Sequence, residues 1–321
     1  MRCIIIEVMI NFLACFIFLL CGLPVAAQTS AQPYSFSVVP SATDSQIATF
    51  DSPHVCWLPG GSQRNQLLVF LPGTNGFPRE NFPFATTAAE LGFHVIFLMY
   101  PDTVAAQQIC PSSNDPNAYM KFRTAIIQGG QFEDFRVSQA DSIENRLAKL
   151  LVYLSRTQPG RGWEQYVDRQ GQIDWSKIVI SGHSQGGGHA YVIAKLHPVA
   201  RVIEFGSPKD YSFYFRRPAS GFDSNTKTPL SRFFAFNHMQ DRAGNCNHDM
   251  QMEIFRQMHM TDLGMVEADA PNTDLRHAHM IFTNEPVPNM TSPKQFHTSV
   301  INGVLSVDPQ VWVYMLTEPV N

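Results

Sequence analysis

The stretch Ile178-Val179-Ile180-Ser181-Gly182-His183-Ser184-Gln185-Gly186-Gly187-Gly188-His189-Ala190 decides the fold prediction. It places the pattern Gly-X-Ser-X-Gly directly after an apolar run and directly before a segment of helical character. This is the setting of a nucleophile elbow, a sharp strand-to-helix turn that exposes a serine hydroxyl. Side chains at Gly182 or Gly186 would collide with neighbouring backbone in such a turn. We therefore expect Ser184 to be a nucleophile.

Two other interpretations of this stretch are weaker. A glycine-rich connection with a chance serine would not need both the preceding strand and the following helix. A phosphate-binding loop would need G-x-G-x-x-G spacing or a Walker lysine, and the stretch has neither. The elbow interpretation also places the N–H of Gln185 at a helix N-terminus, where the helix dipole favours a negatively charged oxygen.

The apolar run at residues 177–180, which opens this stretch, has counterparts along the chain. Together the runs have the pattern of strands buried on both faces of a parallel sheet and lie at residues 66–71, 94–100, 177–180, 201–205 and 232–236. Helical segments are predicted between them at residues 86–91, 141–155 and 185–196. The alternation predicts an α/β fold, a doubly wound and mostly parallel sheet with helices on both faces.

Three segments depart from that alternation. Residues 34–39 alternate polar and apolar side chains and could form edge strands of a leading hairpin. Residues 101–137 and 206–230 carry Pro, Asn, Ser and aromatic side chains without clear periodicity. We expect both to be insertions over the carboxyl edge of the sheet, where ligands bind in such folds. No linker divides the chain, so residues 28–321 are predicted to form one catalytic domain.

The composition excludes several classes of protein. The chain has 321 residues, of which 44% are hydrophobic and only 16% charged, so it can bury a large core and is neither a disordered tail nor a charged coiled coil. The formal net charge of -4 argues against a nucleic-acid partner, which normally needs a concentrated basic face. No repeat of solenoid or propeller length is visible.

The N-terminus is predicted to be a signal peptide covering residues 1–27. Residues 8–27 are almost unbroken apolar sequence, and Val25-Ala26-Ala27 fits a cleavage site before Gln28. The alternative is an uncleaved membrane anchor, since about 20 apolar residues can cross a bilayer. A membrane partner is expected only in that case. Cleavage predicts a secreted protein, either extracellular or periplasmic.

The mature chain would keep three of the six cysteines, Cys56, Cys110 and Cys246. An oxidising compartment favours one disulfide, and proximity in sequence favours Cys56–Cys110, although one sequence cannot fix the pairing. Asn289-Met290-Thr291 is a glycosylation sequon, a pattern that often arises by chance.

The motif Gly-His-Ser-Gln-Gly-Gly-Gly-His-Ala resembles the sequence around the nucleophile in exported esterase-like members of the α/β-hydrolase superfamily. The resemblance extends from about Gln66 to the C-terminus. It implies an eight-stranded, mostly parallel sheet and a catalytic triad in the chain order nucleophile, acid, histidine. It also implies that the loop after an early strand supplies a second N–H to the oxyanion hole. Thr74, in Pro72-Gly73-Thr74, matches that position and would act together with Gln185.

The same chain order leads to candidates for the acid. Asp241 is the first carboxylate after the strand at residues 232–236 and is the preferred one. Asp210, after the preceding strand, is the second choice, and Asp249 is the third. Without the family order a lone loop aspartate would be a poor signal, because such residues are usually caps or turn formers.

For the base, the family order requires a histidine on a late loop. His297 fits, in a polar loop with Pro293 before it and an amphipathic helix after it. His279 is the next choice, although it is expected to flank or lie on the preceding strand. His183, beside the nucleophile, should point the wrong way to accept its proton.

These residues predict a secreted serine hydrolase that cleaves carboxylic esters through Ser184, His297 and Asp241 and an acyl-enzyme. The partner would be a small-molecule, lipid or polymer ester. The mechanism needs no metal or organic cofactor, and the histidine spacings match no zinc pattern. Two alternatives stay open. An amidase or peptidase uses the same triad, and a non-catalytic binding module could use the same scaffold.

Overall fold

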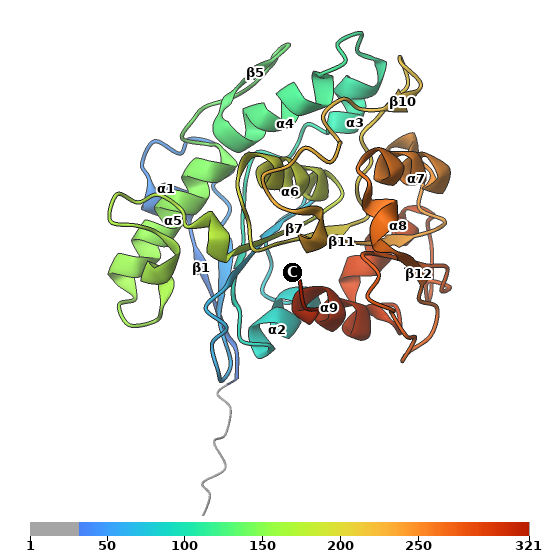
Figure 1. The fold of residues 1–321 in the computed structure, drawn as a ribbon. Helices are drawn as coiled ribbons and strands as arrows, with labels where there is room; N and C mark the ends of the chain where they lie inside the picture. The colour runs from blue at the N-terminus through green and yellow to red at the C-terminus, as the bar shows by residue number, and fades with distance from the viewer. Residues whose placement is uncertain (1–31, 321) are drawn as a thin grey trace, which may run out of the picture. The chain divides into compact units, whose positions relative to one another are not determined.

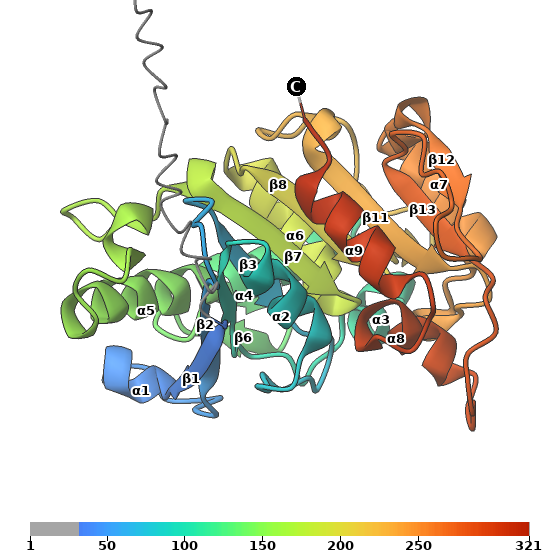
Figure 2. The same cartoon turned by 90° about the horizontal axis from the view of Figure 1, so that it is seen from below.

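The computed structural model describes residues 32–320, so the predicted signal peptide lies outside them. A nine-stranded sheet runs through the described chain, with helices on both faces (Figures 1 and 2). In spatial order its strands are β1 (Tyr34–Val38), β2 (His54–Leu58), β4 (His94–Phe97), β3 (Leu67–Leu71), β7 (Ile178–His183), β8 (Arg201–Phe205), β11 (Phe233–His238), β13 (Met280–Thr283) and β12 (Met265–Glu267). The predicted α/β fold class is confirmed.

Strand direction divides the sheet into two parts. From β4 to β12 all neighbours are parallel, whereas β2 is antiparallel to both β1 and β4. The predicted leading hairpin is thus the antiparallel pair β1 and β2. The strand count is nine rather than the eight that the resemblance implied. The three-residue strand β12 pairs its backbone with the far edge of β13 and so extends the sheet.

The central strand β3 explains why its sequence is a continuous apolar run. Leu67, Val69 and Leu71 enter the hydrophobic cluster on one face of the sheet, and Leu68 and Phe70 enter the cluster on the other. The first face is covered by α4 (Ala118–Gln128), α5 (Ile143–Thr157), α6 (Gln185–Leu196) and α7 (His248–Gln257). The second is covered by α2 (Pro83–Glu90), α8 (Lys294–Asn302) and α9 (Asp308–Thr317). Two-sided burial removes the polar alternation of a half-exposed strand.

The segment 101–137 differs from the prediction. It holds α3 (Ala106–Ile109) and the hairpin of β5 (Gly130–Phe132) and β6 (Phe135–Val137), but its main element, α4, packs against α5 and α6. It is therefore partly a layer of the fold rather than an insertion over the sheet edge. The sequence hides α4 because its buried face carries Arg123, a charge that interrupts the apolar periodicity. The segment 206–230 contains the short hairpin of β9 (Tyr211–Ser212) and β10 (Arg217–Pro218).

Arg123 joins α4 to the start of α6. Its guanidinium lies 2.7 and 2.8 Å from the two carboxylate oxygens of Asp210, and both side chains are fully buried. It also donates to the backbone oxygen of Gln185 at 2.8 Å. A Cβ at Gly188 would lie 2.2 Å from the guanidinium carbon, so only glycine leaves room for Arg123 there. The paired charges and their hydrogen bonds compensate the cost of removing each charge from water.

The predicted disulfide Cys56–Cys110 is not formed, and Cys56, Cys110 and Cys246 are all free and buried. Cys56 lies inside β2, between Phe36 of β1 and Ile96 of β4. Cys110 follows α3, in a segment whose backbone bonds to residue 213 through Pro111. Sequence proximity did not bring these two thiols together, because the sheet holds one and the α3 segment holds the other.

Two further sequence features can be placed. Asn289 of the sequon is exposed, in the loop between β13 and α8. Among residues 32–320, no helix has the length and apolar character needed to cross a bilayer.

Candidate functional site

Ser184 lies in a strained turn between β7 and α6, as the sequence predicted. Its backbone angles are φ 56° and ψ −117°. This conformation is energetically unfavourable for any residue other than glycine. A Cβ at Gly182 would lie 2.2 Å from the carbonyl carbon of Gly186, and one at Gly186 would lie 2.1 Å from the Leu71 oxygen. The glycine pattern therefore lets two strands and a helix meet closely under the serine. The Ser184 N–H donates to the Phe205 oxygen of β8 at 2.8 Å.

Asp241 and His297 are in contact, although 56 positions separate them. Asp241 follows β11, and His297 is the fourth residue of α8 rather than part of a loop. The His297 Nδ1 lies 2.7 Å from the Asp241 Oδ2. Burial raises the pKa of Asp241, but the hydrogen bond and charge of His297 outweigh it, and the pKa stays well below its usual value. Asp241 is therefore an ionised carboxylate that can orient the His297 ring.

Lys209 is a second partner of the same carboxylate, and sequence reasoning missed it. Its Nζ lies 3.0 Å from the Asp241 Oδ2, the oxygen that also accepts from His297. It donates to the Cys246 oxygen at 3.0 Å as well, and the side chain is buried. No pattern in the sequence links residues 209 and 241, because only the adjacency of β8 and β11 brings their following loops together.

His183 supports the other end of the His297 residue. Its Nε2 donates to the His297 backbone oxygen at 2.9 Å. Burial, together with the nearby His297, lowers the pKa of His183 to about 3, so the ring is neutral at ordinary pH. This bond commits the Nε2 to the His297 backbone rather than to Ser184. The ring instead fixes the backbone that carries His297.

The loop after β3 approaches Ser184 closely. A Cβ at Gly73 would lie 3.1 Å from the Ser184 Cβ, and Thr74 follows it. Asp102 orders this loop: its Oδ2 accepts from the Gly76 N–H at 3.0 Å, and its backbone oxygen accepts from Asn75 at 3.2 Å. Within residues 32–320, neither the Thr74 N–H nor the Gln185 N–H donates to another residue. Both remain available to an oxyanion.

The Gln185 side chain fixes the neighbouring wall of the site. Its Oε1 accepts from the Ala106 N–H at 2.8 Å, and its Nε2 donates to the Val104 oxygen at 3.0 Å. The elbow residue thus anchors the start of α3. The sequence suggested only the backbone role of Gln185.

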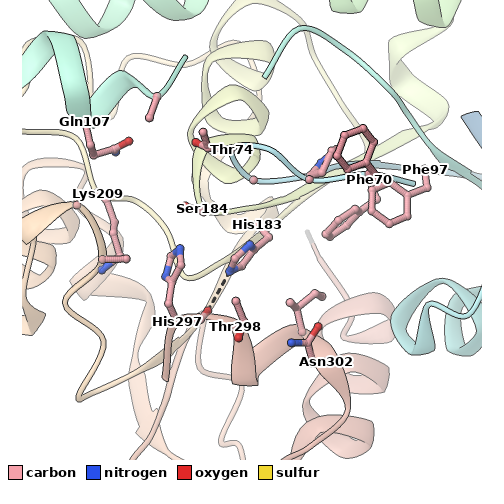
Figure 3. A pocket seen from close by; sticks show the side chains of 18 of the residues that line it. Phe70, Thr74, Phe97, Gln107, His183, Ser184, Lys209, His297, Thr298 and Asn302 are labelled. Atoms are coloured by element: carbon pink, nitrogen blue, oxygen red, sulfur yellow. Dashed lines mark hydrogen bonds between the residues drawn. The ribbon is translucent and has the colours of Figure 1, made fainter. Parts of the chain in front are cut away.

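A cavity of about 560 Å³ unites these elements (Figure 3). Ser184, His297 and Thr74 all line it, and Lys209 and His183 do so as well. In the described residues the Ser184 hydroxyl has no hydrogen bond to the His297 ring. Catalytic hydrogen bonds are often long in ligand-free enzymes and shorten when substrate binds. The arrangement brings together a serine hydroxyl, an imidazole bound to a carboxylate, and two free N–H groups.

The other candidates lie elsewhere. Asp210 is committed to Arg123, and Asp249 is exposed in the first turn of α7. The His279 ring bonds to the Phe233 oxygen and stacks on Phe234. In residues 32–320, no group of three or more His, Cys, Asp or Glu side chains is placed to hold a metal ion.

Comparisons with known proteins give a likeness in structure alone. No family model matches the chain, and no curated protein matches it. Among solved structures, the dienelactone hydrolase from Anabaena variabilis matches with 15% sequence identity and a TM-score of 0.46, covering 90% of this chain and 100% of that one. At this level of identity the likeness carries no information about the reaction.

The buried carboxyl of Asp102 generates a prediction about stability. Burial raises its pKa from 3.8 to about 7. The Asp102 carboxyl therefore ionises above about pH 4 in the unfolded protein but keeps its proton up to about pH 7 in the folded protein. Stability is therefore lost between these pH values. Asp102→Asn keeps an acceptor for the Gly76 N–H and removes the charge. We expect it to raise the Tm at pH 8 by roughly 2–4 °C, the effect of about 1 kcal/mol.

Differential scanning calorimetry from pH 4 to pH 9 measures this gain. It should be small at pH 4 and grow through pH 7. Asp134→Asn, at an exposed turn position between β5 and β6, is the control. A gain for Asp102→Asn that does not change with pH would show that the carboxyl does not titrate in this way.

Proposed function

We propose that this chain is a carboxylic-ester hydrolase that uses Ser184, His297 and Asp241. The observation that carries the proposal is the shared cavity, where the strained Ser184, the His297 ring bound to Asp241 and the Thr74 loop meet. A binding module on this scaffold would not need a serine held in an unfavourable conformation beside an oriented histidine. Strained residues of this kind cluster at active sites.

The first half of the reaction forms an acyl-enzyme. The Ser184 Oγ attacks the ester carbonyl carbon, and the Nε2 of His297 takes its proton. The carbonyl oxygen becomes an oxyanion, which the N–H groups of Thr74 and Gln185 bind. Asp241 stabilises the imidazolium. The tetrahedral intermediate then breaks the bond to the leaving oxygen, which receives the proton from His297.

The second half regenerates the enzyme. Water gives a proton to the His297 Nε2 and attacks the acyl carbon through its oxygen. The bond to the Ser184 Oγ breaks, and that oxygen takes the proton back from His297. The products are the carboxylic acid and the free serine. The chemistry is complete with the chain's own residues.

Replacing Ser184 tests the proposal. Ser184→Ala removes the nucleophile, and we expect kcat for p-nitrophenyl esters to fall by a factor on the order of 10⁴ to 10⁶. A fluorophosphonate probe, which bonds to an activated serine oxygen with loss of fluoride, should label the wild type and not the variant. Mass spectrometry of the labelled peptide locates the adduct.

Ser224→Ala, at an exposed position in the β10–β11 connection, is the matched control and should keep both labelling and turnover. Matched p-nitroanilides test amide cleavage by the same serine. Folded wild-type protein that is neither labelled nor active on any ester or anilide would contradict the proposal and favour a binding module.

We also propose that the protein is exported, with residues 1–27 removed before Gln28. The support is the apolar N-terminal run and the small side chains at its end. We expect the intact mass of protein from the culture medium or periplasm to correspond to a chain that begins at Gln28. A full-length chain in the membrane fraction would indicate an anchor instead.

A further inference from the structure

One wall of the cavity is aromatic. Phe70, Phe82 and Phe97 line it and pack on one another, with ring centroids 4.7 Å apart for Phe70–Phe82 and for Phe82–Phe97 and 4.9 Å apart for Phe70–Phe97. Phe77 stands at the same cavity with 59% of its surface exposed. Tilted and edge-to-face ring contacts favour a further aromatic ring over a saturated one of the same size.

The opposite part of the cavity is polar. Figure 3 shows Gln107 and Lys209 on the other side of Ser184 from Phe70 and Phe97. Asn245 adds a further amide to this part. Lys209 is paired with Asp241, and the other lining cation, Arg79, lies over the Phe82 ring of the aromatic wall. No Asp or Glu is among the described residues that line the cavity, so a positively charged substrate would find no lining carboxylate to pair with.

The position of His297 decides which part receives the leaving group. The leaving oxygen takes its proton from the His297 ring, so the alcohol must lie on that side of Ser184. His297 and Lys209 contact the same oxygen of Asp241, which places His297 beside the polar part. The acyl group then extends toward the phenylalanines.

We infer that the site cleaves esters of an aromatic acid with a polar alcohol that carries no positive charge. This inference rests on the proposed ester hydrolysis and adds the substrate class to it. The rings of Phe70, Phe77, Phe82 and Phe97 hold the acyl ring, and the amides of Gln107 and Asn245 bind alcohol hydroxyls.

Two pairs of substrates test the inference on the intact mature protein. Glyceryl phenylacetate and glyceryl cyclohexylacetate differ only in the aromaticity of the acyl ring, and we expect kcat/KM to favour the first by about two- to tenfold. Phenylacetyl esters of glycerol and choline differ in the charge and in the free hydroxyl groups of the alcohol, and kcat/KM should favour glycerol for both reasons. Chromatography of the released acids gives both ratios.

Phe77→Ala should reduce the phenyl preference, while Tyr214→Ala should preserve it. Tyr214 is a matched control because it is also 59% exposed and does not line the cavity. Phe97→Leu removes a buried ring of the same aromatic wall and should also reduce the phenyl preference. Equal rates for the phenyl and cyclohexyl esters, or a preference for choline, would overturn the inference while leaving ester hydrolysis intact. If no ester is cleaved, the proposed function itself fails.

The contact between Lys209 and Asp241 independently carries a second inference. The Asp241 Oδ2 is shared by two partners, the His297 ring at 2.7 Å and the Lys209 ammonium at 3.0 Å. A positive charge beside this oxygen opposes the proton that His297 gains when it acts as a base. We infer that Lys209 is a positioning residue that holds Asp241 in place and lets His297 lose its proton at lower pH.

Other titratable groups surround this contact. His183 of β7 is neutral, and Asp210 beside Lys209 is occupied by Arg123. From the remaining elements, His238 of β11 lies within electrostatic reach of Asp241. His248 of α7 lies within electrostatic reach of Lys209, and Glu253 of α7 within reach of Cys246. Lys209 is the one lysine or arginine in the described residues with an ion pair to Asp241.

The pH dependence of kcat/KM tests this role. In Lys209→Met the ratio of kcat/KM at pH 5.5 to that at pH 8 should fall by about three- to tenfold, since a tenfold change corresponds to one pH unit. Lys209→Arg keeps the charge and should restore the ratio. Lys209→Gln serves if the Met variant does not fold, which circular dichroism checks. An unchanged ratio in the neutral variants would show that Lys209 is structural only.

Discussion

The backbone of Ser184 is the constraint on which the rest of the site depends. With φ 56° and ψ −117°, the residue is held where an ordinary side chain is disfavoured, so surrounding contacts must enforce the conformation. The close approach of Gly182 to Gly186 and the bond from the Ser184 N–H to Phe205 supply that enforcement. Because β7 and β8 are both buried, the turn cannot relax without moving the sheet.

A second layer of enforcement comes from buried charge. Arg123 fills the space that Gly188 leaves, pairs with Asp210 and binds the Gln185 oxygen at the start of α6. Removing one partner of such a pair leaves an uncompensated charge in the interior, at a cost of about 3–5 kcal/mol. The pair therefore fixes α4, α6 and the loop after β8 relative to one another. That loop carries Lys209, so the same pair also positions the lysine that contacts Asp241.

A feature of the fold or the site could be predicted from the sequence where the residues that form it are contiguous in the chain. The elbow was predictable because its strand, glycines and helix are contiguous. The prediction for residues 101–137 was wrong because the charged Arg123 interrupts the apolar periodicity of α4. The predicted Cys56–Cys110 disulfide was wrong because closeness in sequence does not bring two thiols into contact. Asp241 could be preferred to Asp210 as the acid only because of the chain order of triad residues in the α/β-hydrolase superfamily that the motif resembles. The structure adds a physical reason, since Arg123 occupies Asp210.

The contacts of Lys209, His183 and Gln185 had no signal in the sequence, and they share a purpose in the structure. Each ties a catalytic candidate to a loop from another strand: Lys209 holds Asp241, His183 holds the backbone of His297, and Gln185 holds the start of α3. Side chains that act at a triad must be held within a fraction of an ångström by their neighbours. A parallel sheet gathers its loops at one edge, but it does not fix them to one another. In this chain the polar contacts around the elbow fix these loops to one another. They thereby set the shape of the cavity between the aromatic and polar walls.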